Sequence, residues 1–275
     1  MGPKLRATIE RCVLGLLALV WMLPLLWVIL LSLKPNAVLR RGGANLFVPW
    51  PLTTTHYQKL LGISHTPRWF LNSLIVAAAA TIMTLTLSSL AGYALARIPF
   101  RGRGAVFLVI MAGLMVPEQA ILLPLHRIFA SLDLHNTYTA LVVPRLASPF
   151  GVFLMTQFFR AVPRELEEAA ELDHAGRLRT FLFVMLPLSR PALTTLGIFT
   201  FLSSWNDFLW PLVSATDSDM YTLTVGLASL QGNFAQSESL GFVMASAALA
   251  SLPMVIVYLF FQRYIVRGIA LGNGR

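Results

Sequence analysis

Charged residues and cysteine are scarce in this sequence of 275 residues. Only 12% of the residues are Asp, Glu, Lys or Arg, about half the share that soluble globular proteins carry. Hydrophobic residues make up 56%, and the mean hydropathy is +0.70. A chain with so few charges cannot cover a surface that faces water, which excludes a soluble enzyme. The single cysteine, Cys12, excludes a disulfide framework within the chain. The class that remains is an integral membrane protein.

Lysine is rare, but arginine makes the chain basic. The 21 Lys and Arg residues outnumber the 12 Asp and Glu residues, which gives a net charge of +9. A basic balance can indicate nucleic-acid binding, or it can reflect the excess of Lys and Arg in the cytoplasmic loops of membrane proteins. The basic residues here flank apolar segments and form no stripe with stacking aromatic residues. We therefore attribute them to membrane topology and expect no nucleic-acid partner.

Six apolar segments are long enough to cross a bilayer, which takes about 20 residues. The first has a basic flank and a long apolar run with no small-residue cleavage site after it, so we interpret it as a retained helix and not as a signal peptide. The sequence predicts an all-α polytopic membrane protein with one transmembrane domain over residues 1–275. Its six transmembrane helices are expected near residues 12–33, 70–96, 105–125, 138–159, 191–213 and 240–261, with a cytoplasmic loop at 160–190.

The distribution of basic residues predicts the orientation. Six spans place both termini on one side of the membrane, and that side would hold fourteen of the 21 Lys and Arg residues. Cytoplasmic loops are the basic ones, so both termini are expected in the cytoplasm.

The loop at 160–190 carries five of the twelve acidic residues. Pro163 suits the first position of a helix, and acidic residues follow it where they favour the positive helix end. After a break near His174 and Gly176, apolar residues from Leu178 onward recur at the spacing of a second, amphipathic helix, which Pro187 would end. This loop could lie on lipid headgroups or dock a cytoplasmic partner. The acidity of its first helix favours a partner over anionic lipid.

The segment EEAAELDHAG, followed by VMLPL, resembles the EAA loop of permease subunits in binding-protein-dependent ABC importers. SWNDFLWPL at 204–212, MYTLTVGLASLQG at 220–232 and FFQRYIVRGIALG at 260–272 extend the resemblance to the carbohydrate branch, and specifically to the maltose-type, MalG-like permeases. His174 stands where that family has a glycine, and we expect Gly176 to form the turn in its place.

The resemblance implies the transmembrane subunit of an ATP-driven ABC importer for a sugar or related solute. It implies a second, different permease subunit, two copies of an ATPase that would hold ATP and Mg²⁺, and an extracytoplasmic solute-binding protein. The location would be the bilayer of a bacterial or archaeal plasma (inner) membrane. In such permeases the EAA loop is a coupling helix for the ATPase, and the loop between the last two spans faces the binding protein. The residues so implied are Glu168, Ala169, Ala170, Asp173, His174, Gly176, Leu186 and Pro187 for ATPase coupling, and Met220, Gly226, Gly232 and Asn233 for the binding protein.

Two polar residues, Asn206 and Asp207, interrupt the fifth apolar segment. No Lys or Arg occurs from Pro191 to Gln262, and an unpaired carboxylate in lipid is costly. Asp207 must therefore face protein, water or the end of the span. It could belong to the translocation pathway or gate, or it could hold helices together by hydrogen bonding.

We expect no catalytic residue, metal site or cofactor in this chain. None of its three lysines lies in a phosphate-binding GK[ST] segment, and neither HExxH nor GxSxG occurs. The five histidines lack the spacing of metal ligands and are interpreted as solvated loop residues. The alternative function is a self-sufficient ion-coupled secondary transporter, which would need paired ionisable residues in the middle of the membrane. The sequence offers little beyond Arg145 and Asp207 for that role. An intramembrane enzyme would need a nucleophile and a base that the sequence does not offer.

Overall fold

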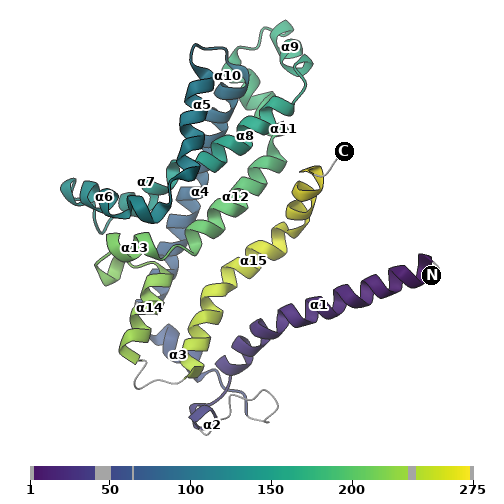
Figure 1. Ribbon diagram of the computed structural model, residues 1–275. Helices are drawn as coiled ribbons and strands as arrows, with labels where there is room; N and C mark the ends of the chain where they lie inside the picture. The colour runs from purple at the N-terminus through teal and green to yellow at the C-terminus, as the bar shows by residue number, and fades with distance from the viewer. Residues whose placement is uncertain (1–2, 41–50, 64, 235–239, 273–275) are drawn as a thin grey trace. The chain divides into compact units, whose positions relative to one another are not determined.

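Helices form nearly all of the structure (Figure 1). The computed structural model describes residues 3–40, 51–63, 65–234 and 240–272, and these residues contain no β-strand. The prediction of an all-α protein is confirmed. The main helices are α1 (Pro3–Ser32), α2 (Asn36–Arg40), α3 (Thr55–Gly62), α4 (Thr66–Arg97), α5 (Arg103–Ala112), α6 (Glu118–Ser131), α7 (Tyr138–Leu146), α8 (Pro149–Ala161), α9 (Glu165–Leu172), α10 (Arg177–Thr180), α11 (Leu186–Leu188), α12 (Arg190–Trp205), α13 (Leu209–Ser214), α14 (Leu223–Phe234) and α15 (Leu240–Gly272). Short 3-10 turns lie at Gly113–Met115 (η1) and Ser218–Met220 (η3), and a π-helical turn lies at Phe181–Met185 (η2).

Three helices are long and apolar enough to cross a membrane unbroken. They cover Thr8–Ser32, Thr66–Arg97 and Leu240–Phe261, close to the predicted first, second and sixth spans. Three bent helix pairs also qualify by composition, so the described residues offer up to six crossings.

Two of the bent pairs lie where the sequence predicts the third and fourth spans, and the other begins in the predicted cytoplasmic loop at 160–190 and continues into the predicted fifth span. Arg103–Met115 and Glu118–Ser131 meet at 100°, so the apolar run predicted at 105–125 does not form one straight helix. Tyr138–Leu146 and Pro149–Ala161 meet at 45°, and Arg177–Leu188 and Arg190–Trp205 meet at 75°. A proline lies at or beside each break, where it removes a backbone donor and opposes a straight helix. The run predicted at 191–213 also stops early, because α12 ends at Trp205 and α13 is a separate short helix.

The described chain divides into two compact units. One comprises the chain up to Pro67 together with Gly226–Pro253, and the other comprises Arg68–Val225 together with the chain from Met254 onward. In the first unit, α3 packs at the end of α1, where His56 Nε2 lies 2.9 Å from the carbonyl oxygen of Lys34. A Cβ at Gly241 would lie 2.4 Å from the same ring nitrogen, so this approach requires glycine.

In the second unit, α8 packs against α4, α5 and α12. The backbones of α4 and α8 come unusually close, since a Cβ at Gly92 would lie 2.6 Å from Met155 Cβ. One turn earlier, a Cβ at Gly151 of α8 would lie 2.4 Å from Ser88 Oγ of α4. Small residues let transmembrane helices approach in this way. This crossing fixes the position of α4 within the unit.

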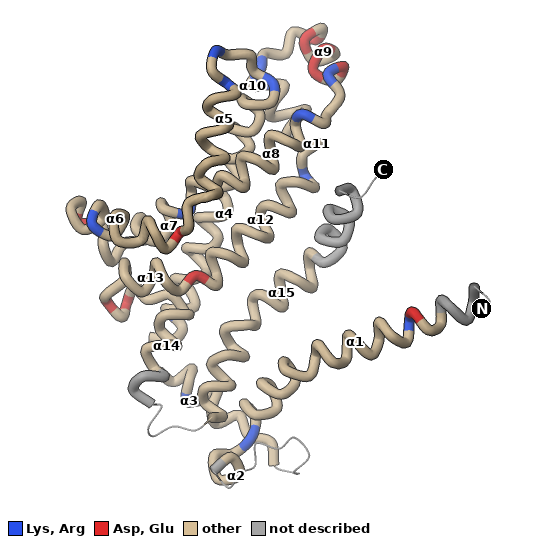
Figure 2. The backbone as a smooth tube through the Cα atoms, in the orientation of Figure 1, with Lys and Arg blue, Asp and Glu red and all other residues tan. Residues whose placement is uncertain are grey.

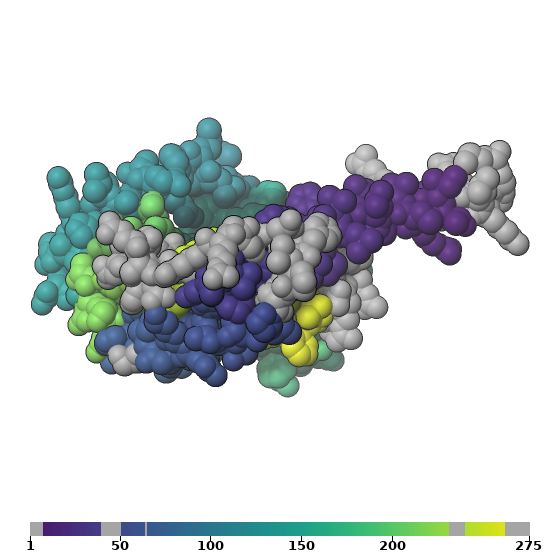
Figure 3. Space-filling view, turned by 90° about the horizontal axis from the view of Figure 1, so that it is seen from below, coloured from purple at the N-terminus to yellow at the C-terminus, as the bar shows by residue number. Residues whose placement is uncertain are grey.

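A smaller aromatic cluster joins α6, α7 and α13 in the same unit. The rings of Phe129 and Trp210 meet edge to face at 5.5 Å, and Trp210 Nε1 donates to the Ala140 carbonyl at 2.8 Å. The surfaces of α6 and α13 adjoin in the space-filling view (Figure 3). In this unit the charged residues gather around α9 and α10, and again around α6, α7 and α13, with an uncharged stretch of helices between them (Figure 2).

Candidate functional site

The helix α9 carries the acidic part of the predicted coupling loop. It begins at Glu165 and not at Pro163, and three of its glutamates lie in the first turn, where carboxylates stabilise the positive helix end. Glu168 is exposed, whereas Ala170 is buried at 9% exposure. The helix therefore turns a carboxylate outward and rests on the rest of the unit through a small side chain.

The end of α9 is a tight left-handed turn. The N–H of Ala175 donates to the Ala170 carbonyl at 2.9 Å, and the N–H of His174 donates to the Glu171 carbonyl at 3.0 Å. These two bonds define a Schellman turn, which places one residue in the left-handed region. That residue is His174, with φ of 55°, whereas Gly176 is extended, with φ of −67°. The expectation that Gly176 forms the turn is wrong, because the histidine itself adopts the conformation that usually favours glycine.

The second half of the predicted loop is helical over Arg177–Leu188, one residue beyond the predicted end at Pro187. A π-helical turn at Phe181–Met185 interrupts it, and both of these residues are buried beside Tyr93 of α4. Among the remaining predicted coupling residues, Ala169, Asp173, Gly176 and Pro187 are exposed and Leu186 is half-buried. The apolar stripe therefore belongs to the core of the unit at Phe181 and Met185, while Leu178 and Leu182 remain exposed.

Arg97, the last residue of α4, binds the predicted coupling loop at two points. Its Nη1 lies 3.4 Å from Glu167 Oε2, and its Nη2 donates to the Val162 carbonyl. The side chains of Arg97 and Glu167 are only 7% and 17% exposed. The Glu167 carboxylate also interacts with the hydroxyl of Tyr93, one turn earlier in α4. The chain entering α9 is therefore fixed to α4 by a largely shielded charge pair.

Asp207 forms an ion pair with a residue that lies far from it in the sequence. Its Oδ2 lies 2.5 Å from Arg145 Nη2, and the two side chains are 11% and 16% exposed. Arg145 Nη1 also donates to Ser203 Oγ at 3.1 Å. The pair joins the break between α7 and α8 to the break between α12 and α13. Asn206 ends α12, and its exposed side chain donates to the Leu202 carbonyl at 2.9 Å, which is a helix-end hydrogen bond.

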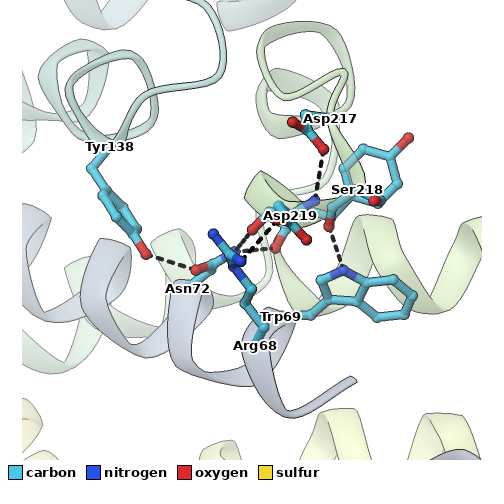
Figure 4. Close-up of polar contacts among 8 residues, drawn as sticks. Arg68, Trp69, Asn72, Tyr138, Asp217, Ser218 and Asp219 are labelled. Carbon is cyan, nitrogen blue, oxygen red and sulfur yellow. Dashed lines mark hydrogen bonds and ion pairs between the residues drawn. The ribbon is translucent and has the colours of Figure 1, made fainter. Parts of the chain in front are cut away.

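The far end of α4 holds the segment at residues 214–222, which contains η3 and is called here the η3 segment (Figure 4). Trp69 Nε1 donates to the Ser218 carbonyl at 2.7 Å. Asn72 Nδ2 donates to the carbonyls of Asp219 and Tyr221 at 2.8 and 2.9 Å, and its Oδ1 accepts a bond from the Tyr138 hydroxyl at 2.7 Å. Because Asn72 is 1% exposed, these bonds are shielded from water.

The segment predicted to contact a binding protein is not a plain loop, because it contains η3 and α14. Asp219 forms an ion pair with Arg68, with Asp219 Oδ2 2.8 Å from Arg68 Nη1. Met220 is half-buried at the end of η3, and Gly226 is buried within α14. Gly232 and Asn233 lie on the last turn of α14, their side chains outside the described part of the structure.

Comparison with known proteins identifies the family. Residues 85–271 match the family described as the inner membrane component of binding-protein-dependent transport systems. The chain is also 37% identical over 261 residues to an arabinooligosaccharide transport system permease protein of Halalkalibacterium halodurans, covering 94% of this chain and 92% of that protein. The chain belongs to this family of importer permeases. The trehalose/maltose transport system permease protein MalG of Thermococcus litoralis is 33% identical over 261 residues, with the same coverage of both chains.

A solved structure confirms the fold of the permease. A chain of a bacterial ABC transporter involved in the import of the acidic polysaccharide alginate superposes with a TM-score of 0.81, over 95% of this chain and 96% of that chain. At 23% identity this likeness concerns the fold alone. Together with the family, it establishes a multi-pass membrane permease and the transmembrane subunit of an ABC importer. The family works with a solute-binding protein, and ATP hydrolysis belongs to a separate subunit.

The permease family decides between the two transport mechanisms that the sequence left open. Arg145 and Asp207 do form the pair that an ion-coupled transporter would use, but the family is that of ABC importers. The pair is therefore best understood as a contact between broken helices of an importer subunit.

The histidines of the permease are not all solvated. His56 is buried at 3% exposure on α3, and the rings of His126 and His135 lie 4.5 Å apart. Both ring nitrogens of His135 face backbone carbonyls at 3.3 Å. Within the described ranges, no three His, Cys, Asp or Glu side chains gather as a metal site would require.

Arg97 and Asn72 were not predicted as functional residues from the sequence, although they bind other segments at the two ends of α4. Both carry a readable signal, because a polar or charged side chain within or at the end of an apolar run needs a specific partner. The partners lie 70 and 147 positions further along the chain, at Glu167 and Asp219, and no periodicity in the sequence reveals that pairing.

Proposed function

We propose that this importer subunit carries a sugar or related solute and takes its energy from an ATPase that docks on α9. The observation that supports this docking is that α9 is an acidic helix with an exposed carboxylate and with both of its ends fixed. Its first turn is acidic, Glu168 is exposed, and both of its ends are held, by Arg97 at the entrance and by the turn at His174 at the exit. A preorganised helix binds a partner without the cost of ordering it first.

The exposed surface of α9 has the chemistry of a protein-binding site. Glu168 offers a charge for a basic group, and the exposed Ala169 permits close approach. Asp173 and His174 extend this exposed surface to the end of the helix. An acidic surface opposes binding to anionic lipid, which supports an ATPase over a membrane surface as the occupant.

The sugar substrate is supported by the named substrates of the relatives, arabinooligosaccharides in one case and trehalose and maltose in another. The second, different permease subunit and the dimer of ATPases complete the assembly that we propose. ATP and Mg²⁺ would be held by the ATPases, and this chain would need no cofactor of its own. The protein would reside in the plasma membrane of a bacterium or archaeon, with both termini and α9 in the cytoplasm, as the excess of basic residues on that side favours.

Two further contacts complete the proposal. Met220, Gly226, Gly232 and Asn233, between the last two candidate spans, would meet the solute-binding protein outside the membrane. Asn206 and Asp207 would lie along the translocation pathway, where the breaks in α7–α8 and α12–α13 can reorganise between states. A two-state importer needs elements whose contacts differ between its two conformations.

The test of this function is co-purification followed by reconstitution. We expect the chain to retain an ATPase and a second permease in mild detergent, to hydrolyse no ATP by itself, and to support ATP-dependent uptake of an oligosaccharide when all subunits and the binding protein are supplied. ATP hydrolysis by the purified chain alone, or uptake driven by an ion gradient without ATPase, would refute the proposal.

A further inference from the structure

A single arginine connects α4 to both sides of the link that enters α9. Arg97 Nη2 donates to the carbonyl of Val162, the residue that follows α8, while Nη1 pairs with Glu167 in the first turn of α9 at 3.4 Å. With 7% of the arginine side chain exposed, this pair is screened by water and salt much less than a surface pair. The segment between Val162 and Glu167 therefore cannot shift without either moving Arg97 or leaving its charge unpaired.

The last turns of α4 are also packed into the core around the coupling loop. The Tyr93 ring lies 5.7 Å from Phe159 of α8 and 5.1 Å from Phe181 of the π-helical turn. At Gly92 the backbone of α4 meets that of α8 with no room for a Cβ. Tightly packed interiors transmit displacement because they offer few empty volumes into which side chains can relax. A movement of α9 relative to the membrane would therefore be passed to α4.

The other end of α4 holds the η3 segment. Trp69 and Asn72 together donate three hydrogen bonds to its backbone carbonyls, at 2.7 to 2.9 Å (Figure 4). From Trp69 to Arg97 the helix extends about 42 Å at the usual rise per residue, more than the roughly 30 Å of a hydrocarbon core. One continuous helix thus makes direct contacts with the coupling loop and with the segment at its opposite end.

We propose that α4 carries motion between the coupling loop and the η3 segment, and that Arg97 is the positioning residue that makes α4 move with α9. The inference rests on the proposed docking of an ATPase on α9. Closure of the ATPases would displace α9, Arg97 would carry α4 with it, and Trp69 and Asn72 would move the η3 segment. Because coupling between two sites is reciprocal, engagement of a binding protein near the η3 segment would act on the ATPase through the same helix.

The test uses the complete importer in proteoliposomes, with its ATPases, second permease and binding protein. We expect Arg97→Gln and Glu167→Gln to lower the ratio of binding-protein-stimulated to unstimulated ATP hydrolysis by about tenfold, within the range typical of coupling between two sites. Solute uptake should fall in parallel, while the ATPase still co-purifies. Arg101→Gln removes an exposed charge from the link that follows α4, outside the coupling loop, and should leave the ratio unchanged. If Arg97→Gln does not assemble, the nearly isosteric Glu167→Gln decides the question.

Two further measurements separate transmission from simple structural support. Reversing the pair with Arg97→Glu and Glu167→Arg should recover part of the lost stimulation, which a loss of folding alone would not allow. Hydrogen exchange of residues 218–222 should change when wild-type importer is trapped with nucleotide, and should not change in Glu167→Gln. Wild-type stimulation and nucleotide-dependent exchange in both single variants would overturn the inference. The docking proposal is tested apart from it, because it fails if Glu168→Lys and Ala169→Trp both retain the ATPase and full transport, whatever the variants of Arg97 and Glu167 do.

Discussion

The ion pair between Arg145 and Asp207 offers a direct test of how the broken helices are held. The perturbation is the replacement of Asp207 by Asn, which removes the negative charge and leaves Arg145 with Ser203 as its remaining side-chain partner on α12. The side chains of Arg145 and Asp207 are 16% and 11% exposed, so the arginine charge would be left largely shielded from water.

The magnitude follows from that burial. For charge centres about 4 Å apart, the attraction at an effective dielectric constant of about 20 is roughly 4 kcal/mol before desolvation is counted. Removing one partner of a buried pair costs about 3–5 kcal/mol, because the remaining charge is uncompensated. Residual water at this site lowers the expectation to about 3 kcal/mol. At roughly 2–4 °C per kcal/mol for a chain of this size, the melting temperature should fall by roughly 6–12 °C.

The assay is thermal unfolding of the purified importer for Asp207→Asn, Arg145→Gln and the double variant. Each single variant should be destabilised, and the double variant should be less destabilised than the sum, because no unpaired charge remains; the coupling free energy should be about 2 kcal/mol. Asn206→Ala is the matched control, since its exposed side chain makes only a helix-end hydrogen bond. Additive effects, or shifts below about 0.5 kcal/mol in the single variants, would show that the ion pair does not stabilise the contact between the broken helices.

Three other outcomes follow from backbone geometry and the proposed contacts. Gly92→Ala should destabilise the permease by about 1–3 kcal/mol, because its Cβ would lie 2.6 Å from Met155 Cβ, whereas Gly197→Ala, with its nearest neighbour at 3.5 Å, should be close to neutral in the same melting experiment. His174→Gly should stabilise the end of α9 by about 1 kcal/mol, since the histidine has φ of 55°, and hydrogen exchange of α9 should slow; faster exchange would contradict the turn as described. Bulky residues at Gly232 and Asn233 should reduce ATP hydrolysis stimulated by the binding protein and leave subunit assembly intact; unchanged stimulation would mean that this end of α14 makes no contact with the binding protein.

Composition and apolar length predicted the helical class and the three unbroken candidate spans. These features depend on local sequence, because a run of apolar residues without charges has few other stable solutions. The position of α9 was also predicted to within two residues at its start, from acidic residues that follow a proline. The bends were not predicted, although prolines marked them, because a proline fixes where a helix weakens and tertiary packing fixes the angle.

Long-range pairing accounts for what the sequence could not predict. Asp207 had no base within its own apolar segment, and only the fold brings Arg145 to it across 61 intervening positions. The turn at His174 was misjudged for a different reason. Glycine is preferred at a left-handed position but is not required there, and the two backbone hydrogen bonds that close the turn place His174 in that conformation while Gly176 is extended.

The most direct measurement of the central proposal compares Glu168→Lys and Ala169→Trp for solute transport and for co-purification of the ATPase. Both side chains are exposed on α9, so neither substitution disturbs the core or the candidate spans. Loss of the Glu168 contact should cost about 1.5–3 kcal/mol of the association free energy, with added repulsion from the new positive charge. A tryptophan at Ala169 should overpack the contact at a cost of about 1–3 kcal/mol. The account predicts that both variants insert normally but lose the ATPase or transport no solute, with Arg101→Gln behaving as wild type. Full transport and full ATPase retention in both variants would contradict the assignment of α9 as the coupling helix.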